Sequence, residues 1–209
     1  MDLALFECRS PASLCAAAAL LTERNATVQR LLLNANDVDE EGARTLARAL
    51  GAAASLRELV LRGNRVGDDG AEALAEALAD NPPLRVLDPG RNGVRERGAC
   101  ALAAALGRNT RLRALRVDQN APGRGGHAAL AEAAARSGTL AFLDADLPRD
   151  LVGGVHAAAR RNRAAHRAGR AQRAALEGDP DAALPWLIPD LVRVVAAYAG
   201  DAPGETELW

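Results

Sequence analysis

Aromatic residues are scarce in this chain of 209 residues, where they make up 2% of the sequence. The hydrophobic fraction of 49% therefore comes mostly from alanine and leucine. Such small side chains each bury little area, so we expect the stability of the fold to depend on the stacking of similar units. The same scarcity argues against binding of single-stranded nucleic acid, because its bases stack on aromatic rings.

Long apolar runs and paired cysteines are also missing. No run approaches the roughly 18 apolar residues that a membrane span needs. The three cysteines form no C-x-x-C pair, which suggests a reducing compartment. Asp2 and Glu7 precede any apolar segment, so the start does not read as a secretory signal. With a net charge of −1, we expect a cytoplasmic protein with no membrane contact, for which nucleic acid is an unlikely partner.

Catalytic signatures are absent as well. His127, His156 and His166 have no metal-ligand spacing with one another or with cysteine. The glycine run 123–126 precedes an expected helix but lacks the Lys-Ser/Thr of a phosphate-binding loop, so it reads as a degenerate repeat turn. The sequence therefore predicts no enzyme activity, no cofactor and no metal.

What the sequence does contain is a repeat with a fixed period of 28 residues. The segment LRELVLRGNRVGDDGAEALAEALADNPP, from Leu56 to Pro83, recurs in phase from Val28, Leu84 and Leu112. Self-similarity at such a period indicates a stacked array. The positions that recur most strictly are leucines (Leu31, Leu59, Leu87, Leu115, Leu143), asparagines (Asn36, Asn64, Asn92, Asn120) and glycines (Gly42, Gly70, Gly98, Gly126).

This pattern, L-x-x-L-x-L-x-x-N followed by glycine and a Leu/Ala-rich half, resembles the leucine-rich repeat family in its ribonuclease-inhibitor-like subclass. The resemblance covers residues 28–147. It implies a curved α/β solenoid with a concave parallel sheet, convex helices and helical caps at both ends. It implies no particular function, because such arrays serve many roles.

The recurring residue types have physical reasons. The leucines point inward from short strands, and each repeat buries them against its neighbours. Asparagine has both a donor and an acceptor, so Asn36, Asn64, Asn92 and Asn120 can satisfy backbone groups of their own and the adjacent repeat. Acidic residues precede the Ala-rich half of the first three repeats, where they suit the positive end of a helix.

The positions of the 28-residue repeats predict the domain boundaries. Residues 1–27 are expected to form an N-terminal capping half-repeat with a helix at Ser13–Glu23. Residues 28–148 hold four full repeats and a terminal strand at Leu140–Leu143, and residues 149–209 a C-terminal helical cap or tail.

Three irregularities lead to further expectations. Pro89 cannot donate a backbone hydrogen bond, so the strand of repeat three should end after about Leu87. The glycine run 123–126 should delay the helix of repeat four until about His127. Cys100 is expected to be a small buried residue of a repeat helix.

The exposed strand positions are the candidate site, since a solenoid binds through them. They form columns of charged residues, with arginines stacked about 4.8 Å apart in one of them. We predict a docking face for a protein with an acidic patch; alternatively, the arginines only provide solubility and are neutralised by neighbouring acids. The candidate residues are Arg57, Glu58, Arg62, Arg85, Asp88, Arg91, Arg113, Arg116 and Asp118.

Two features follow the repeats. Arg160, Arg163, Arg167 and Arg170 share one face of an expected helix, which favours a solvated capping helix. The segment Leu184–Tyr198 resembles the core helix of F-box domains, with Asp190 where glutamate is usual.

We therefore predict a non-catalytic module that binds an unidentified protein on its concave face. One alternative is a GTPase-activating protein resembling the Ran-specific leucine-rich-repeat family. A second is a ubiquitin-ligase substrate adaptor that uses the F-box-like helix.

Overall fold

The computed structural model describes residues 2–4 and 28–177, with side chains from residue 28 to residue 168. The repeats belong to one compact unit, Met1–Arg163, and Ala164–Trp209 forms a second. The strands are β1 (Asp2–Ala4), β2 (Arg30–Leu32), β3 (Glu58–Val60), β4 (Val86–Asp88), β5 (Ala114–Arg116) and β6 (Phe142–Asp144). The helices are α2 (Glu40–Ala52), α3 (Gly67–Ala79), α4 (Glu96–Arg108), α5 (Gly123–Arg136) and α6 (Arg149–Glu177).

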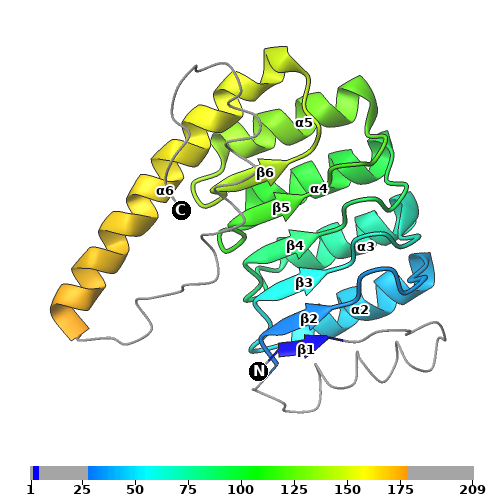
Figure 1. The fold of residues 1–209 in the computed structure, drawn as a ribbon, viewed down its shortest axis with the longest axis horizontal. Coiled ribbons are helices and arrows are strands. Elements are labelled where there is room, and N and C mark those ends of the chain that lie inside the picture. The colour runs from blue at the N-terminus through cyan, green and yellow to red at the C-terminus, as the bar shows by residue number, and fades with distance from the viewer. Residues whose placement is uncertain (1, 5–27, 178–209) are drawn as a thin grey trace, which may run out of the picture. The chain divides into compact units, whose positions relative to one another are not determined.

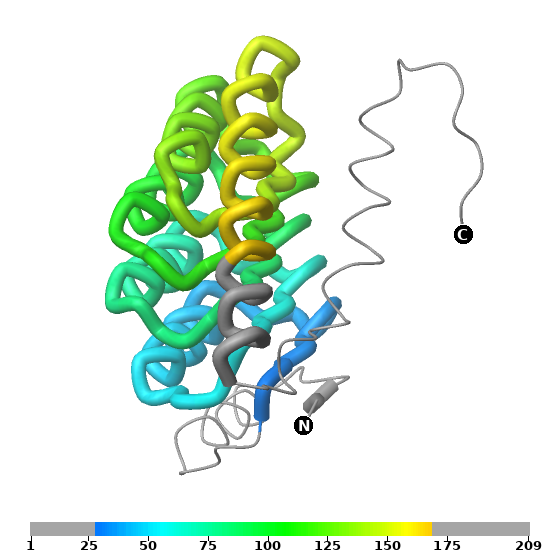
Figure 2. The backbone as a smooth tube through the Cα atoms, turned by 90° about the vertical axis from the view of Figure 1, so that its left-hand side faces the viewer, coloured from blue at the N-terminus to red at the C-terminus, as the bar shows by residue number. Residues whose placement is uncertain are grey.

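The strands form one parallel sheet in chain order, as Figure 1 shows. Each strand pairs with the next at a shift of 28 residues, so that Leu31 lies beside Leu59 and Leu59 beside Leu87. The helices α2 to α5 lie side by side on one face of this sheet (Figure 2). This arrangement confirms the α/β solenoid expected from the repeat.

The core lies between the sheet and the helices. Leu31, Leu59, Leu87 and Leu115 of successive strands are fully buried there. They pack with helix leucines of the same repeats, such as Leu46 and Leu74. The aliphatic core is therefore continuous through the array, as the stacking of units that cannot fold singly requires.

Strand β1 was not expected from the sequence analysis. It pairs with β2 in the same register as the other strands, with Leu3 beside Leu31. The residues after it, including the expected helix Ser13–Glu23, lie outside the described part of the chain. The same holds for the F-box-like segment Leu184–Tyr198.

The expected early end of β4 is wrong for the strand itself. It runs through Asp88, whose carbonyl accepts a hydrogen bond from the N–H of Leu61 at 2.8 Å. Only the pairing of β4 with β5 stops at Leu87. Pro89 lacks the N–H that would continue this pairing, but Pro89 follows β4 and does not shorten the strand itself.

The expected late start of α5 is also wrong. The helix begins at Gly123, which has a φ of 63°, and Gly67 at the start of α3 has a φ of 60°. These two glycines share one phase of the repeat. A positive φ suits glycine, so Gly123 turns the chain into the helix and does not delay it.

Helix α6 follows the last strand. It covers the terminal repeat through buried Val155 and through polar contacts with the backbone. The Asn162 Nδ2 atom donates to the carbonyls of Ser137 and Leu140 at 2.8 and 2.7 Å, and Arg163 Nη1 donates to the carbonyl of Ala141 at 2.9 Å.

Cys100 is exposed on α4, contrary to the expectation of a buried residue. The equivalent positions of the two preceding repeats hold Arg44 and Glu72, so this phase faces away from the core. The outward orientation of the position explains the difference.

Candidate functional site

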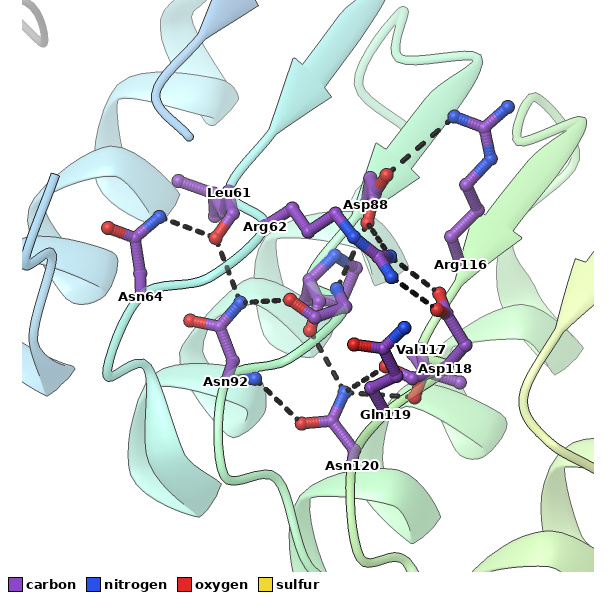
Figure 3. A network of polar contacts seen from close by, with 12 residues as sticks. Leu61, Arg62, Asn64, Asp88, Asn92, Arg116, Val117, Asp118, Gln119 and Asn120 are labelled. Carbon is purple, nitrogen blue, oxygen red and sulfur yellow. Dashed lines mark hydrogen bonds and ion pairs between the residues drawn. The ribbon is translucent and has the colours of Figure 1, made fainter. Parts of the chain in front are cut away.

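The strand face is the face of the sheet opposite the helices, together with the residues that directly follow each strand. The structure divides the candidate residues on and around it into three groups. Arg62, Asp88, Arg116 and Asp118 come together in one charged cluster (Figure 3). Glu58 forms a separate ion pair. Arg57 lies at the amino-terminal edge of the sheet.

The asparagines form a ladder beside this cluster (Figure 3). Asn64 Oδ1 accepts from the N–H groups of Asn36 and Val38 at 2.8 and 3.0 Å. Its Nδ2 atom donates to the carbonyl of Leu33 at 2.8 Å and to that of Leu61 at 2.5 Å. One buried side chain thus satisfies four backbone groups from two repeats, which fixes the loop after each strand.

The ladder continues along the array. Asn92 Nδ2 donates to the carbonyls of Leu61 and Gly90 at 2.8 and 3.0 Å. Asn120 Oδ1 accepts from the N–H of Asn92 at 2.9 Å. Because these contacts join neighbouring repeats, the positions from which the charged side chains project are rigidly held.

The strongest contact of the cluster joins Arg62 to Asp118. Arg62 Nη1 and Nη2 donate to the two carboxylate oxygens of Asp118 at 2.8 and 2.6 Å. Asp118 is 7% exposed, whereas the Arg62 side chain is 34% exposed. The hydrogen bond to Asp118 raises the pKa of Arg62 above its ordinary value, so the Arg62 guanidinium is charged at any physiological pH.

Gly90 explains how Arg62 can contact Asp118 across the repeat that lies between them. Arg62, Gly90 and Asp118 occupy one column, at successive intervals of 28 residues. A Cβ atom at position 90 would overlap Arg62 Nη1 and would lie 3.0 Å from the nearest carboxylate oxygens of Asp88 and Asp118. Two strand spacings amount to about 10 Å, which an arginine side chain can span if nothing fills the middle position.

Asp88 connects the two arginines. Its carboxylate lies 3.7 Å from Arg62 Nη1 and 3.6 Å from Arg116 Nη1, and it accepts from the N–H of Gly90 at 3.0 Å. Burial raises the pKa of Asp88 despite these cations. Arg116 also lies over the ring of Phe142, 5.7 Å from its centroid, which is within the range of a cation–π contact.

The last strand carries acids that sequence reasoning did not single out. Asp144 lies beside Arg116 in the β5–β6 register. Burial, followed by repulsion from Asp118 and Asp146, raises the pKa of Asp144 to about 6, although Arg116 and Arg62 oppose the shift. The carboxylate of Asp146 accepts from the N–H of Gln119 at 2.6 Å. Asp144 occupies the same repeat position as Asp88, and Asp146 the same position as Asp118, and this correspondence could have identified both acids from the sequence.

The other candidate residues lie around this cluster. Glu58 is 8% exposed and pairs with Arg30 at 2.7 Å. Arg57 is half-buried and donates to the carbonyls of Ala54 and Pro83 at 3.5 and 3.4 Å, so it lies along the loops at the sheet edge. Arg85 and Arg113 occupy the same phase and are also half-buried, and Arg91 is exposed after β4.

Two further findings concern the described residues alone. Among them, no group of three or more His, Cys, Asp or Glu side chains could hold a metal ion. None of the helices in these ranges is long and apolar enough to cross a membrane.

Comparisons with known proteins agree with this architecture. The family model described as Leucine Rich repeat matches residues 52–75, and no curated protein matches the chain. The leiomodin-1 actin-binding site 2 structure has a TM-score of 0.69 at 20% identity, covering 76% of this chain and 94% of its own. The tropomodulin C-terminal domain of Caenorhabditis elegans has a TM-score of 0.69 at 18% identity, covering 76% and 98%.

The chain is a leucine-rich repeat protein. The in-phase repeats, the parallel sheet with its 28-residue register and the asparagine ladder all agree with the match to one repeat. At 18 to 20% identity, the two solved structures show that this leucine-rich repeat protein shares their fold.

Proposed function

We propose that this leucine-rich repeat protein is a non-catalytic module that binds another protein on its strand face. The observation that carries the proposal is the fixed charged cluster of Arg62, Asp88, Arg116 and Asp118 on the face opposite the helices. Solubility alone requires only exposed, mobile charges. Here the charges are held in place by one another and by the sheet, and such preorganisation favours specific recognition.

The fold comparison supports protein binding in general terms. The leiomodin-1 structure is titled an actin-binding site, so an array of this shape is associated there with a protein partner. Actin is therefore a reasonable first candidate to test, by co-sedimentation of the full chain with filaments. The 28-residue period supports the ribonuclease-inhibitor-like subclass, and a cytoplasmic location remains a prediction.

The experiment is affinity capture with the full chain, followed by identification of the retained protein and measurement of its binding. The strand-side variant is Arg62→Met with Arg116→Met, which removes both cations of the cluster. The control is Arg48→Met with Arg108→Met, which makes the same charge change at exposed positions of α2 and α4. We expect the identified protein to lose binding to the first variant and to keep it with the second.

Equal binding by the two variants, with both still folded, would contradict a strand-side site. The two alternatives have their own tests. A GTP-hydrolysis assay examines the GTPase-activating hypothesis. Deletion of residues 178–209, which lie outside the described structure, examines the ligase-adaptor hypothesis, because only an adaptor needs that segment to bind its second partner.

A further inference from the structure

The ladder residue Asn92 is followed by a glycine, and no other asparagine of the sequence is. Asparagine in this context is chemically labile, because the backbone nitrogen of the next residue can attack its side-chain carbonyl carbon. Glycine has no β-carbon that shields this nitrogen, and its backbone reaches the angles that the attack requires. The pair Asn92 and Gly93 is therefore the place where this chain most readily loses an asparagine amide.

The backbone nitrogen of Gly93 is available for such an attack. In the preceding repeat, the equivalent N–H of Arg65 donates to the carbonyl of Val38 at 2.8 Å, and in the following repeat that of Ala121 donates to Val94 at 2.9 Å. Among the described residues, the N–H of Gly93 has no such acceptor. Gly93 is also exposed, and a Cβ atom there would meet no other segment within 4 Å, so water reaches this nitrogen.

The side chain of Asn92, by contrast, is held in place. It is 2% exposed, and its Nδ2 atom donates to the carbonyls of Leu61 and Gly90 at 2.8 and 3.0 Å. Its Oδ1 atom accepts from the N–H of Val66 at 3.2 Å. Loss of the amide requires Nδ2 to leave both carbonyls, so the folded ladder opposes the reaction.

We propose that Asn92 is a site of spontaneous deamidation, closed in the folded array and reached when repeat three opens. The Gly93 nitrogen forms a bond to Cγ of Asn92, the bond from Cγ to Nδ2 breaks, and ammonia leaves with the proton of the Gly93 N–H. Water then opens the cyclic imide at either of its carbonyl carbons. The products are aspartate and isoaspartate at position 92, and the only co-reactant is water.

Asn120 controls the opening that this reaction needs. Its Oδ1 atom accepts from the N–H groups of Asn92 and Val94 at 2.9 and 3.0 Å, so it holds the backbone on both sides of Gly93. Local opening of these bonds frees the Asn92 side chain without unfolding the whole array. The rate of deamidation in the folded protein should therefore follow the population of this open state.

The product cannot restore the ladder. Aspartate has no N–H groups for the carbonyls of Leu61 and Gly90, and its negative charge would lie beside both oxygens. Isoaspartate also lengthens the backbone. Because Leu61 precedes Arg62, and Gly90 lies between Arg62 and Asp118, the modification irreversibly disturbs the support of the charged cluster.

The test follows the full chain by peptide mass spectrometry, in buffer and in denaturing urea at the same pH. Gly93→Ala adds the shielding β-carbon, and its effect is assessed in urea, where the φ of 70° at this position imposes no strain. Asn120→Ala removes the acceptor that holds both sides of Gly93. Asn109→Ala is the matched control, since Asn109 is 5% exposed and bonds to Leu78 and Leu112 at the other edge of the sheet.

In urea, we expect position 92 to deamidate at least about tenfold faster than any other asparagine, and Gly93→Ala to lose this excess. In buffer, the folded parent should react at least about tenfold more slowly than in urea, by the factor that protects the Val94 N–H from hydrogen exchange. Asn120→Ala should raise the rate in buffer at least about fivefold, whereas Asn109→Ala should leave it within about twofold.

Three outcomes overturn the proposal. Without an excess at position 92 in urea, there is no labile site. Equal rates in buffer and urea show that the fold does not protect it, and equal acceleration by Asn120→Ala and Asn109→Ala assigns the reaction to global unfolding. If Asn120→Ala does not fold, the parent in urea below its unfolding transition decides, because its deamidation must rise in step with exchange of the Val94 N–H.

Discussion

The guanidinium of Arg62 and the carboxylate of Asp118 form two hydrogen bonds across an intervening strand, 56 residues apart in sequence. Most contacts of the array join a repeat to its nearest neighbour. This pair joins next-nearest neighbours, and it forms because the residue between them is Gly90. The cluster should therefore couple three repeats energetically.

Replacing Arg62 by methionine should lower the free energy of unfolding by about 1 to 3 kcal/mol, because the buried carboxylate of Asp118 loses its partner. Replacing both residues, as Arg62→Met with Asp118→Leu, should cost less than the sum of the single changes. Urea unfolding of the four proteins gives the coupling energy. Additive costs would show that the pair contributes nothing to stability.

Gly90→Ala should destabilise the parent, because the new methyl group displaces the Arg62 guanidinium from Asp118. We expect a loss of about 1 kcal/mol that largely disappears in an Arg62→Met background. The control is Gly51→Ala in α2, where a Cβ meets nothing within 4 Å and alanine should stabilise. The same loss with and without Arg62 would assign the cost to the backbone.

Asn64→Ala should cost roughly 1 to 3 kcal/mol, since it leaves buried backbone groups of two repeats without a partner. Asn34→Ala is the matched control, because this exposed residue stands two positions before the ladder asparagine Asn36. Its cost should stay within about 0.5 kcal/mol. Urea unfolding measures both, and similar small values would mean that the ladder is not structural.

Backbone protection should be weakest in residues 84–139. Pro89 removes one N–H from the pairing of β4 with β5, and no side chain caps the first turn of α5. By contrast, Asp39 caps α2 by accepting from the N–H of Gly42 at 2.9 Å. Native-state hydrogen exchange should therefore be faster in residues 84–139 than in residues 28–55. The slowest exchange in the later repeats would refute this expectation.

The raised pKa of Asp144, about 6, predicts a pH dependence of stability. The native state holds this proton more tightly than the unfolded chain does, so its contribution is fully present below pH 4 and is lost as pH rises through 6. Asp144→Asn should remove this loss, making the variant more stable than the parent at pH 7 by on the order of 1 kcal/mol, after screening by solvent.

Two measurements check this pH effect. Carboxyl NMR gives the pKa of Asp144 directly, and urea unfolding at pH 4.5 and pH 7 gives the stability of both proteins. A native pKa near 4 for Asp144, or an unchanged pH dependence in the variant, would show that burial does not govern this carboxylate.

The sequence predicted the strands, the helices and the ladder because each depends on a residue that recurs every 28 positions. Leu59 and Asn64 have equivalents in other repeats, so their environments repeat as well. Strand β1 could have been found by the same rule, since Leu3 lies 28 positions before Leu31. The start of α5 was missed because glycine was interpreted as a helix breaker, although Gly67 and Gly123 share a phase.

The charged cluster could not be predicted in the same way. Its contacts depend on residues that differ between repeats, such as Arg62, Gly90 and Asp118 in one column. Strand spacing alone suggests that adjacent residues pair. Arg62 instead reaches Asp118 because the arginine side chain is long and Gly90 has no side chain between them. Strand spacing in the sequence does not reveal this contact. Arg57 was likewise expected to face solvent, but the half-buried residue donates to carbonyls at the sheet edge.

The contact of Arg163 with the carbonyl of Ala141 has a consequence for the length of the array. In the preceding repeat, the equivalent carbonyl of Arg113 accepts from the N–H groups of Ala141 and Phe142. Among the described residues, Arg163 thus supplies to Ala141 the kind of donor that the next strand supplies to Arg113. Further 28-residue units could be inserted between existing repeats, but not after β6 while α6 occupies that edge. A chain that ended before α6 would expose a strand edge that templates pairing with other chains, and aggregation would follow.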